Sequence, residues 1–425
     1  MIFAAFRVRS FRFQWSADAL TSWAFEMETI ILGWYVMVQT GSVLWLTAFG
    51  ALQFLGTLVA PMFGVLGDRL GGRIVLCAMR ATYAVFAALL TLLVVTGFLT
   101  PAWVLVVSTL AGIVRSNDIV LRNTLIAETI PAEHLIGALG LSRATTDSAK
   151  VIGALTGAGL STLLGIGYSY VFVMICYVAS FAFTLGVARR APMPDPGASP
   201  RGAWPSVASV GIPGPSRWRD LVDGLALVMR TPELLAMMLL AFLINLTAYP
   251  VSGGGLLPYV AQRVFHTDAS GLGWLVASFS LGGFLGSITT VLMGGLRRPE
   301  RATFVCTAIW YALLFGFGHT SSLGLGLLTL LVAGFFQNVA MISMTGTLIA
   351  AAGEGFRGRV MGVRMLAVYG MPLGLVALGF LIERFGYTLS ISVASAVGLL
   401  FTFLIALRWR ASIWDTGRTA APQRV

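Results

Sequence analysis

Charged residues are scarce in this chain. Of its 425 residues only 11% are charged, whereas 57% are hydrophobic, and the mean hydropathy is +0.87. A soluble domain carries about a quarter charged residues. The composition therefore excludes a water-soluble enzyme and predicts an integral membrane protein.

Lysine is almost absent, because Lys150 is the only lysine among 28 basic residues. A phosphate-binding P-loop needs Gly-Lys-Ser/Thr, and Lys150 stands between Ala149 and Val151. The chain therefore lacks this route to nucleotide hydrolysis, and uphill work has to draw on an ion gradient or a partner. The net charge of +11 does not indicate nucleic-acid binding, since the arginines are spread between long apolar runs.

Cysteine and histidine are sparse as well. Three cysteines stand singly in apolar runs without a CxxC pair, and three histidines lie at loops or span ends. These residues are Cys77, Cys176, Cys306, His134, His266 and His319. The pattern offers no disulfide framework, metal site or histidine proton relay, so we expect neither a metal nor another cofactor.

Long apolar runs make up most of the remaining sequence. A transmembrane helix needs about 20 mostly apolar residues, and twelve such stretches are separated by short breaks. They cover residues 17–40, 43–67, 74–97, 101–125, 136–164, 168–189, 233–260, 270–294, 302–319, 323–350, 360–382 and 387–408. Three arginines precede the first run without a small-residue cleavage site, which predicts a retained first helix.

A break in hydropathy divides the chain into two parts. Residues 191–216 contain seven prolines together with glycine and serine, a composition typical of a linker. We therefore expect a six-helix bundle over 1–190, a cytoplasmic linker over 191–217, a second six-helix bundle over 218–410 and a cytoplasmic tail over 411–425. Trp218 to Arg230 are apolar on one face and charged on the other, which predicts an interfacial helix ahead of the second bundle.

Arginine is concentrated on one side of the predicted spans, with only Arg263 and Arg384 clearly on the other. Cytoplasmic flanks of membrane helices are enriched in basic residues. The distribution predicts a multi-pass protein of the cytoplasmic (inner) membrane with both termini in the cytoplasm.

The loop after the second span carries a glycine-rich, charged motif, Gly64-Val65-Leu66-Gly67-Asp68-Arg69-Leu70-Gly71-Gly72-Arg73. Its glycines allow two helices to approach closely, and its charges can form a network at the cytoplasmic rim. Here the chain resembles the major facilitator superfamily, whose signature between helices 2 and 3 is G-x-x-x-D-R-x-G-R-R or a near variant. The matching places are held by Gly64, Asp68, Arg69, Gly72 and Arg73.

Shorter matches extend this resemblance over nearly the whole chain. Leu257-Pro258-Tyr259 and Gly271-Leu272-Gly273-Trp274 are similar to the branch of bacterial permeases that includes the enterobactin exporter. The resemblance implies an all-α integral membrane fold of twelve helices in two pseudo-symmetric six-helix bundles. It also implies that Asp68 and Arg73 latch the bundles at the cytoplasmic side when the pore faces outward; the alternative is a static loop that only sets topology.

The fifth span bears on the direction of transport. Exporters of the superfamily commonly carry G-x-x-x-G-P-x-x-G-G in this helix, and the present chain has a run of glycines from Gly153 to Gly159 without the proline. The arginine that many antiporters carry in helix 4 is replaced by Ser108. The glycine run is the part that resembles exporters, and it favours export by proton antiport.

Two glutamates lie about half-way along the first span. A charged group in hydrocarbon costs about 2.5–3.5 kcal/mol even on insertion scales, so such residues are strong functional candidates. Glu26 and Glu28 point about 200° apart on a helix and cannot face the same cavity. Either is a candidate for proton coupling, because burial favours the protonated carboxyl. The alternative for each is a neutral or paired structural glutamate.

The fourth span has Arg115, Asp118 and Arg122 on one face, at i, i+3 and i+7. Such a face can bind an anionic substrate or couple to the proton-carrying carboxylate. For Asp118 and Arg122 we favour the alternative, an ion-pair network with Asp68 and Arg73 that belongs to the cytoplasmic gate. Arg115 lies deeper and is the candidate for substrate binding.

The fifth span has Arg143, Asp147 and Lys150 on one face, at i, i+4 and i+7. Asp147 is a further candidate for proton coupling. The three residues can also satisfy one another as a structural triad.

The second half offers neutral polar residues as substrate-binding candidates. Asn245 and Tyr249 precede a proline and three glycines, which predicts a discontinuous helix of the kind found near substrate sites. Gln337, Asn338 and Tyr369 are the other candidates, and hydrogen bonding between helices is the alternative role for all of them.

We therefore expect a proton-coupled exporter that moves a small molecule by alternating access. Its partners would be the substrate, protons and the lipid bilayer, with no nucleic acid, and it would act as a monomer. The alternatives are an importer or uniporter on the same fold, and a non-transporting membrane sensor. An integral-membrane enzyme would need a His/Asp or metal constellation that the sequence does not offer.

Overall fold

The computed structural model describes residues 2–56, 72–116, 118–130, 132–187, 217–253, 255–293, 296, 298–353 and 355–414. Within these ranges all regular structure is helical and no strand occurs. The predicted all-α class is therefore confirmed. The predicted linker, apart from its last residue Arg217, and most of the predicted tail lie outside the described residues.

The described residues of the first half contain seven helical elements. They are η1 (Ile2–Arg7), α1 (Arg9–Thr40), α2 (Val43–Leu52), α4 (Gly72–Val95), α5 (Pro101–Arg115), α6 (Asp118–Thr129) and α7 (Ala132–Leu185). Gly165 interrupts the 54 residues of α7 with φ 77° and ψ 172°, a conformation that glycine adopts readily. At about 1.5 Å per residue α7 is long enough for two crossings, so it accounts for the expected spans 136–164 and 168–189.

The second half is more often interrupted. It contains α8 (Arg217–Arg230), α9 (Pro232–Thr247), α10 (Tyr249–Ser252), α11 (Leu257–Tyr259), η3 (Val260–Val264), α12 (Ala269–Leu292), α13 (Pro299–Gly318), α14 (Leu323–Ala352), α15 (Arg357–Ala367), α16 (Gly370–Phe385), α17 (Tyr387–Arg408) and α18 (Arg410–Trp414). The elements from α9 to η3 form the expected discontinuous span over 233–260. α8 is bent by 108° from α9, a geometry compatible with an interfacial helix.

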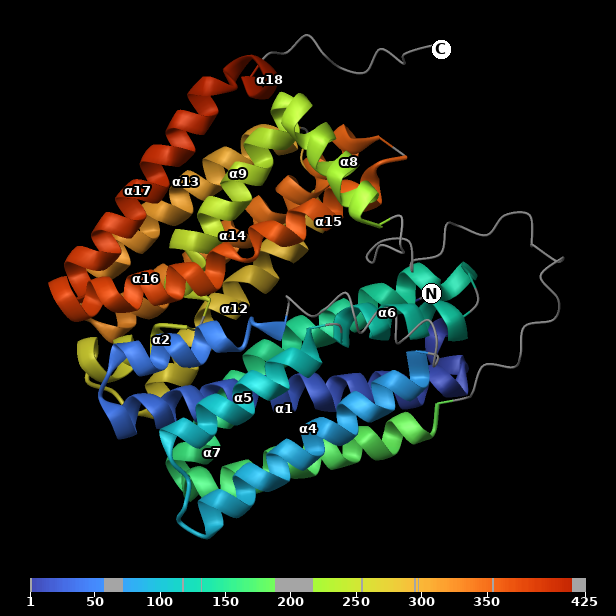
Figure 1. Cartoon of the computed structure of the whole chain (residues 1–425), viewed down its shortest axis with the longest axis vertical. Helices are drawn as coiled ribbons and strands as arrows, with labels where there is room; N and C mark the ends of the chain where they lie inside the picture. The colour runs from blue at the N-terminus through green and yellow to red at the C-terminus, as the bar shows by residue number, and fades with distance from the viewer. Residues whose placement is uncertain are drawn as a thin grey trace, which may run out of the picture.

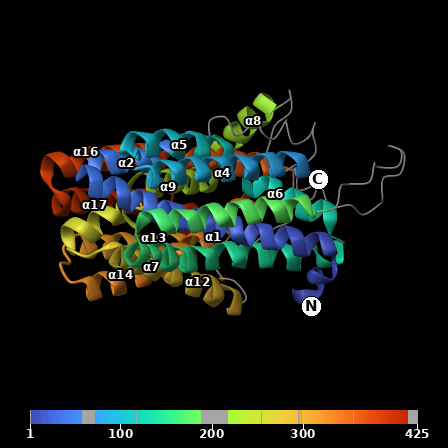
Figure 2. The same ribbon diagram turned by 90° about the horizontal axis from the view of Figure 1, so that it is seen from below.

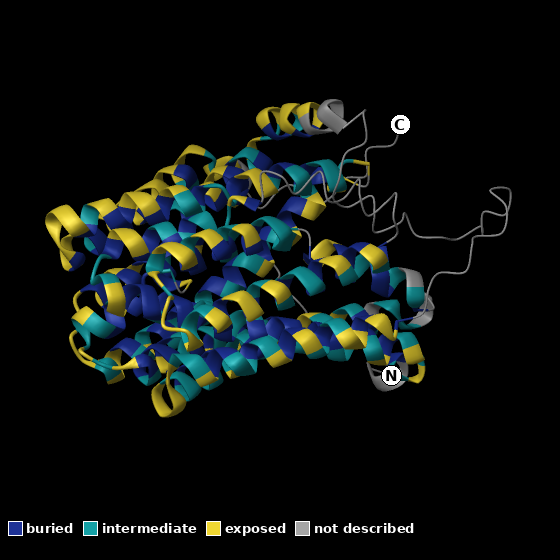
Figure 3. Cartoon of the chain, turned by 60° about the horizontal axis from the view of Figure 1, so that its bottom comes forward, coloured by how far each residue is buried: buried dark blue, intermediate teal, exposed yellow. Residues whose placement is uncertain are grey.

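Length and hydropathy identify the membrane-crossing helices. Eight helices in the described residues are long and apolar enough to cross a membrane, or nine if the bent pair α8–α9 counts as one span. α1 is long enough at 32 residues but carries charged residues along its length. Large apolar side chains remain exposed on the outer faces of both halves, as expected for lipid contact (Figure 3).

Each half has its own apolar core. Buried side chains of α1, α4, α5 and α7 form one cluster, and those of α9, α12, α13, α14 and α17 form most of another. In Figure 1 the blue-to-green half lies below the yellow-to-red half. Seen from below, the helices of both halves run alongside one another in the same general direction (Figure 2).

The halves meet near the end of the molecule where α1 joins α2, which we call the outer end. A Cβ on Gly379 of α16 would lie 2.2 Å from Thr47 Oγ1 of α2, and a Cβ on Gly273 of α12 would lie 2.4 Å from Cβ of Ala158 in α7. Glycine therefore allows helices of opposite halves to approach closely here. The opposite end, which holds the N-terminus and α8, is called the inner end.

Candidate functional site

A cavity of about 910 Å³ lies between the two halves. One wall comes from α1, α2 and α7, and the other comes from α12, α14, α15, α16 and the interrupted segment after α9. Its lining reaches Ile349 near the inner end of α14. The size suits a drug-sized ligand, and the position between two packed halves is typical of a ligand site.

The two glutamates of α1 line different spaces, which confirms the expectation from their spacing. Glu26 lines the central cavity, whereas Glu28 lines a smaller space of about 170 Å³ between α1, α2 and α5. A Cβ on Gly153 of α7 would lie 2.6 Å from Cβ of Glu26, so the two helices touch at this glutamate. In the described part of the chain, no hydrogen bond or ion pair joins the Glu26 carboxylate to another residue.

Glu28 is held by three donors within the first half. The hydroxyl of Tyr170 donates to Oε1 at 2.6 Å and that of Tyr177 donates to Oε2 at 2.7 Å. Arg115 Nη2 lies 3.4 Å from Oε2. Each carboxylate oxygen of Glu28 thus has a hydrogen-bond donor from the first half.

Arg115 is a partner of Glu28 and does not line the central cavity. Its guanidinium carbon lies 3.4 Å from the centroid of the Phe25 ring, and its Nη2 also donates to the Tyr177 hydroxyl at 3.2 Å. Arg115 lines the 170 Å³ space together with Glu28. Arg115, predicted to bind substrate, therefore lies beside the central cavity and contacts Glu28 and Tyr177 of its own half.

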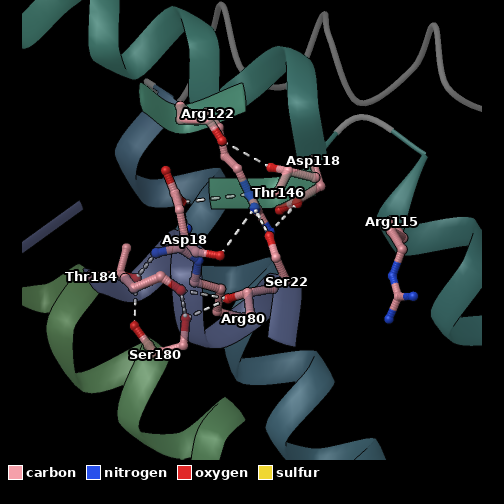
Figure 4. A network of polar contacts seen from close by, with 12 residues as sticks. Asp18, Ser22, Arg80, Arg115, Asp118, Arg122, Thr146, Ser180 and Thr184 are labelled. Atoms are coloured by element: carbon pink, nitrogen blue, oxygen red, sulfur yellow. Dashed lines mark hydrogen bonds and ion pairs between the residues drawn. The ribbon is translucent and has the colours of Figure 1, made fainter. Parts of the chain in front are cut away.

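A second charged cluster lies nearer the inner end of the first half (Figure 4). Arg80 of α4 is fully buried, and Asp18 of α1 with Asp118 and Arg122 of α6 are at most 6% exposed. Arg80 pairs with Asp18, and Arg122 pairs with Asp118 and lies 3.5 Å from Asp18. Two carboxylates and two guanidinium groups therefore form one buried network.

Neutral donors and acceptors complete this network. Arg122 Nη1 donates to Ser22 Oγ at 2.8 Å, and Gln14 Nε2 donates to the Arg122 carbonyl at 2.9 Å. Arg80 also donates to Thr184 of α7. The network thus links α1, α4, α6 and α7, so it stabilises the packing of the first half.

The sequence prediction missed Asp18 and Arg80. The concentration of arginine on one side of the spans suggests a cytoplasmic flank for Arg80, whereas it lies eight residues after the start of α4. A signal was present, because Gln14, Asp18 and Ser22 are spaced by four residues and share one face of α1.

The cytoplasmic gate motif lies largely outside the described residues, including Gly64, Asp68 and Arg69. Gly72 is the first residue of α4, and Arg73 Nη2 donates to the Leu185 carbonyl at 2.7 Å. Among the described residues, Asp118 pairs with Arg122, and Arg122 lies near Asp18 instead of reaching the gate motif; Asp68, the other expected partner, lies outside them.

The charged residues of the fifth span pair with one another, as in the structural alternative for this face, although the side chain of Arg143 is exposed. Arg143 Nε lies 3.1 Å from Asp147 Oδ2, and Lys150 Nζ lies 3.2 Å from Asp147 Oδ1. Arg143 and Lys150 line the central cavity on the same wall as Glu26. Two cations thus share one carboxylate.

The polar side chains with which the second half lines the cavity are neutral, apart from one arginine. Gln337 Nε2 donates to the Tyr249 hydroxyl at 2.5 Å, and Ser287 Oγ donates to Asn338 Oδ1 at 3.0 Å. Tyr249, Gln337 and Asn338 all line the cavity, as expected.

Two other candidates of this half lie away from the cavity, whereas the basic residue that the sequence offers in the same span as Tyr369 lies at it. Asn245 donates to the Ala241 carbonyl of its own helix at 2.8 Å, and Tyr369 lies at the break between α15 and α16. Neither lines the central cavity. Arg364 of α15 does line it, and its Nη1 donates to Thr345 Oγ1 at 2.8 Å.

Comparisons with known proteins agree with this architecture. The sequence profile of the Major Facilitator Superfamily matches residues 16–253. A comparison with curated proteins gave no match.

Solved structures share the fold at low sequence identity. The nucleoside transporter NupG is 14% identical with a TM-score of 0.67, covering 96% of this chain and 100% of its own. A bacterial homolog of the human lysosomal transporter Spinster, inward-facing and unoccupied, is 13% identical with a TM-score of 0.70, covering 96% and 99%. A POT family transporter in complex with a thioalcohol-conjugated peptide is 12% identical with a TM-score of 0.69, covering 96% and 97%. The profile spans more than half of the chain, which therefore belongs to the Major Facilitator Superfamily.

Proposed function

We propose that this chain moves a small molecule out of the cytoplasm in exchange for protons, by alternating access between its two halves, with Glu26 as the proton-carrying group. The observation that carries the proposal is a carboxylate on the wall of a 910 Å³ cavity between the halves. Membership of the superfamily and the transporter folds it resembles support a secondary transporter over an enzyme.

Glu26 fits the coupling role better than Glu28 because of its surroundings. Glu28 accepts hydrogen bonds from two tyrosines and faces Arg115, so releasing or binding a proton would disrupt three contacts. Glu26 lacks such partners among the described residues and faces the cavity, beside a wall that also carries Lys150. A carboxyl in that position can exchange a proton with the cavity as its exposure changes. Asp147 is the weaker candidate, because it is shared by Arg143 and Lys150.

The arrangement of the halves supports pick-up of substrate from the cytoplasm. The glycine contacts between the halves lie at the outer end, and the cavity reaches toward the inner end. Under the positive-inside rule the inner end is cytoplasmic, so the cavity would open to the cytoplasm. The membrane would be the cytoplasmic membrane, with both termini inside.

The glycines of α7 support the exporter assignment. A Cβ on Gly153 would lie 2.6 Å from Cβ of Glu26, and one on Gly157 would lie 2.9 Å from Cα of Met27. The run that resembles the exporter motif of helix 5 therefore packs directly against the part of α1 that bears Glu26. This contact allows movement of α7 to change the environment of the glutamate.

Proton coupling is tested with purified protein in proteoliposomes, using a substrate identified by a thermal-shift screen. We expect Glu26→Gln to carry substrate only down its own gradient, without proton flux, and the matched variant Glu28→Gln to keep the wild-type ratio of protons to substrate. An unchanged ratio in Glu26→Gln and in the double variant would refute the role of Glu26. Uptake by inverted membrane vesicles against efflux from right-side-out vesicles determines the direction, and transport only into right-side-out vesicles would show an importer.

A further inference from the structure

We infer that the substrate is an amphiphilic anion, a carboxylate or similar oxyanion on an apolar body, and that Arg364 binds its charged group. This inference rests on the proposed transport function and names the substrate class of the same cavity. Arg364 projects from α15 into the cavity wall of the second half.

Arg364 has no counter-charge among the described residues. Its Nη1 donates a hydrogen bond to the neutral Thr345 hydroxyl at 2.8 Å. Thr345 Oγ1 in turn donates to the Met341 carbonyl at 2.7 Å, so its lone pair is directed at the guanidinium. Thr345 thereby fixes one edge of the guanidinium and leaves other N–H donors for a ligand.

The other basic residues of the cavity each have a carboxylate partner. Arg143 and Lys150 share the carboxylate of Asp147 on the opposite wall, and Glu26 lies on that wall as well. A guanidinium in a membrane cavity is stable when it is paired with an anion or bathed in water. The wall of the second half therefore presents an unbalanced positive charge, which an anionic ligand would neutralise.

Tyr249 supplies a second donor on the same wall. Its hydroxyl oxygen accepts the Gln337 amide hydrogen at 2.5 Å, so the hydroxyl hydrogen is directed elsewhere. The ring is held edge-to-face against Trp310 with centroids 5.4 Å apart. A guanidinium and a positioned phenol together provide donors suited to a planar oxyanion.

Apolar side chains line the rest of the cavity. Phe25 and Phe49 contribute from the first half, and Phe279, Met341 and Leu375 contribute from the second. Burial of apolar ligand surface against these groups would favour a compound with a hydrocarbon or aromatic body. The carboxylate would then sit at the second half while the body spans toward the first.

The test measures binding, separately from transport, with a matched pair of fluorescent probes. Dansylglycine carries a carboxylate on an aromatic body, and dansylglycinamide has the same body without the charge. We expect wild-type protein in detergent to bind dansylglycine about tenfold or more tightly than the amide. Arg364→Gln should abolish this preference by weakening binding of the carboxylate alone, and Arg364→Lys should keep part of it.

Arg384→Gln, which changes an exposed arginine in the last turn of α16, is the matched control and should retain the preference. Equal affinity of wild-type protein for the two probes, or a preference that survives Arg364→Gln, would overturn the inference. If the probes overturn the substrate inference but Glu26→Gln still loses proton coupling, the transport proposal stands without it. Conversely, carboxylate-selective binding without any transport would support the binding site and contradict the transport function.

Discussion

The two halves of this transporter stabilise their polar groups in different ways. The first half buries acidic and basic side chains in networks, Asp18 with Arg80, Asp118 and Arg122, and Glu28 with Arg115. The second half pairs neutral groups, such as Tyr249 with Gln337 and Thr247 with Tyr311. Breaking a buried ion pair leaves an uncompensated charge, whereas breaking a neutral hydrogen bond costs far less.

This difference assigns distinct tasks to the halves. The ion-pair networks tie α1 to α4, α6 and α7, so α1 is held firmly on the side that presents Glu26 to the cavity. The neutral pairs of the second half exchange partners at little cost, as a wall that binds and releases a ligand requires. Under the proposed function, proton exchange would belong to the first half and substrate recognition to the second.

The change expected to have the largest effect on stability is Asp18→Asn. This change leaves Arg80 buried without a carboxylate, and we expect a loss of about 3–5 kcal/mol in unfolding free energy, measured in detergent by thermal or chemical denaturation. Asp147→Asn is the matched control in the same half, because its partner Arg143 is 67% exposed, and it should cost about 0–1 kcal/mol.

If Asp18→Asn does not fold, a paired replacement keeps the test decisive. Asp18→Leu with Arg80→Met removes both charges together and should recover most of the lost stability. Equal, small losses for Asp18→Asn and Asp147→Asn would show that the buried network does not stabilise the first half.

A second test compares one hydroxyl in each half. Tyr177 donates to the charged Glu28 at 2.7 Å, and Tyr311 shares a hydrogen bond of 2.7 Å with the neutral Thr247 hydroxyl. Both tyrosines are at most 1% exposed. Tyr177→Phe should therefore cost about 1.5–3 kcal/mol and Tyr311→Phe about 0.5–1.5 kcal/mol, by the same denaturation measurement. Equal costs would remove the energetic distinction between the halves.

The smallest expected effect concerns Asp268, a carboxylate of the second half that caps a helix. Its Oδ1 accepts from the backbone N–H of Ser270 at 3.0 Å and of Gly271 at 3.2 Å at the start of α12. Asp268→Ala should cost about 1 kcal/mol, while Glu383→Ala, at an exposed site of α16, should cost less than about 0.5 kcal/mol.

The Asp268 cap also predicts a pH dependence. The hydrogen bond from the Ser270 hydroxyl lowers the pKa of Asp268 below its ordinary value of 3.8. A lowered folded-state pKa means that the stabilisation is fully present above pH 3.8 and is lost as the pH falls below it. The difference between wild type and Asp268→Ala should therefore shrink only at such acid pH, and a difference that shrinks near neutral pH would contradict the assignment.

Local patterns in the sequence predict much of this structure. Apolar runs locate the helices, and spacing along a helix predicts both the divergence of Glu26 from Glu28 and the triad around Asp147. Pro250 and the glycines after it predict the interruption that follows α9. These features depend on residues close together in the chain.

Contacts between helices are not predictable in this way. The pairing of Asp18 with Arg80 depends on how α1 packs against α4, and it joins residues 62 positions apart. The break between α15 and α16 was missed inside the expected span 360–382. Pro372 provides a local reason for it, because proline cannot donate to the carbonyl four residues earlier, and α16 accordingly begins at Gly370.

The central claim is that the halves rock about the cavity under control of Glu26. Spin-label pairs at the inner ends of α4 and α13 (Ile74→Cys with Arg298→Cys) and at their outer ends (Phe98→Cys with Ser321→Cys), with the native cysteines replaced by alanine, report this motion as distances measured in nanodiscs. On acidification we expect the inner distance to shorten as the outer distance lengthens, in wild type and Glu28→Gln but not in Glu26→Gln. A single unchanging distance at both ends, or a response that survives in Glu26→Gln, would contradict the account.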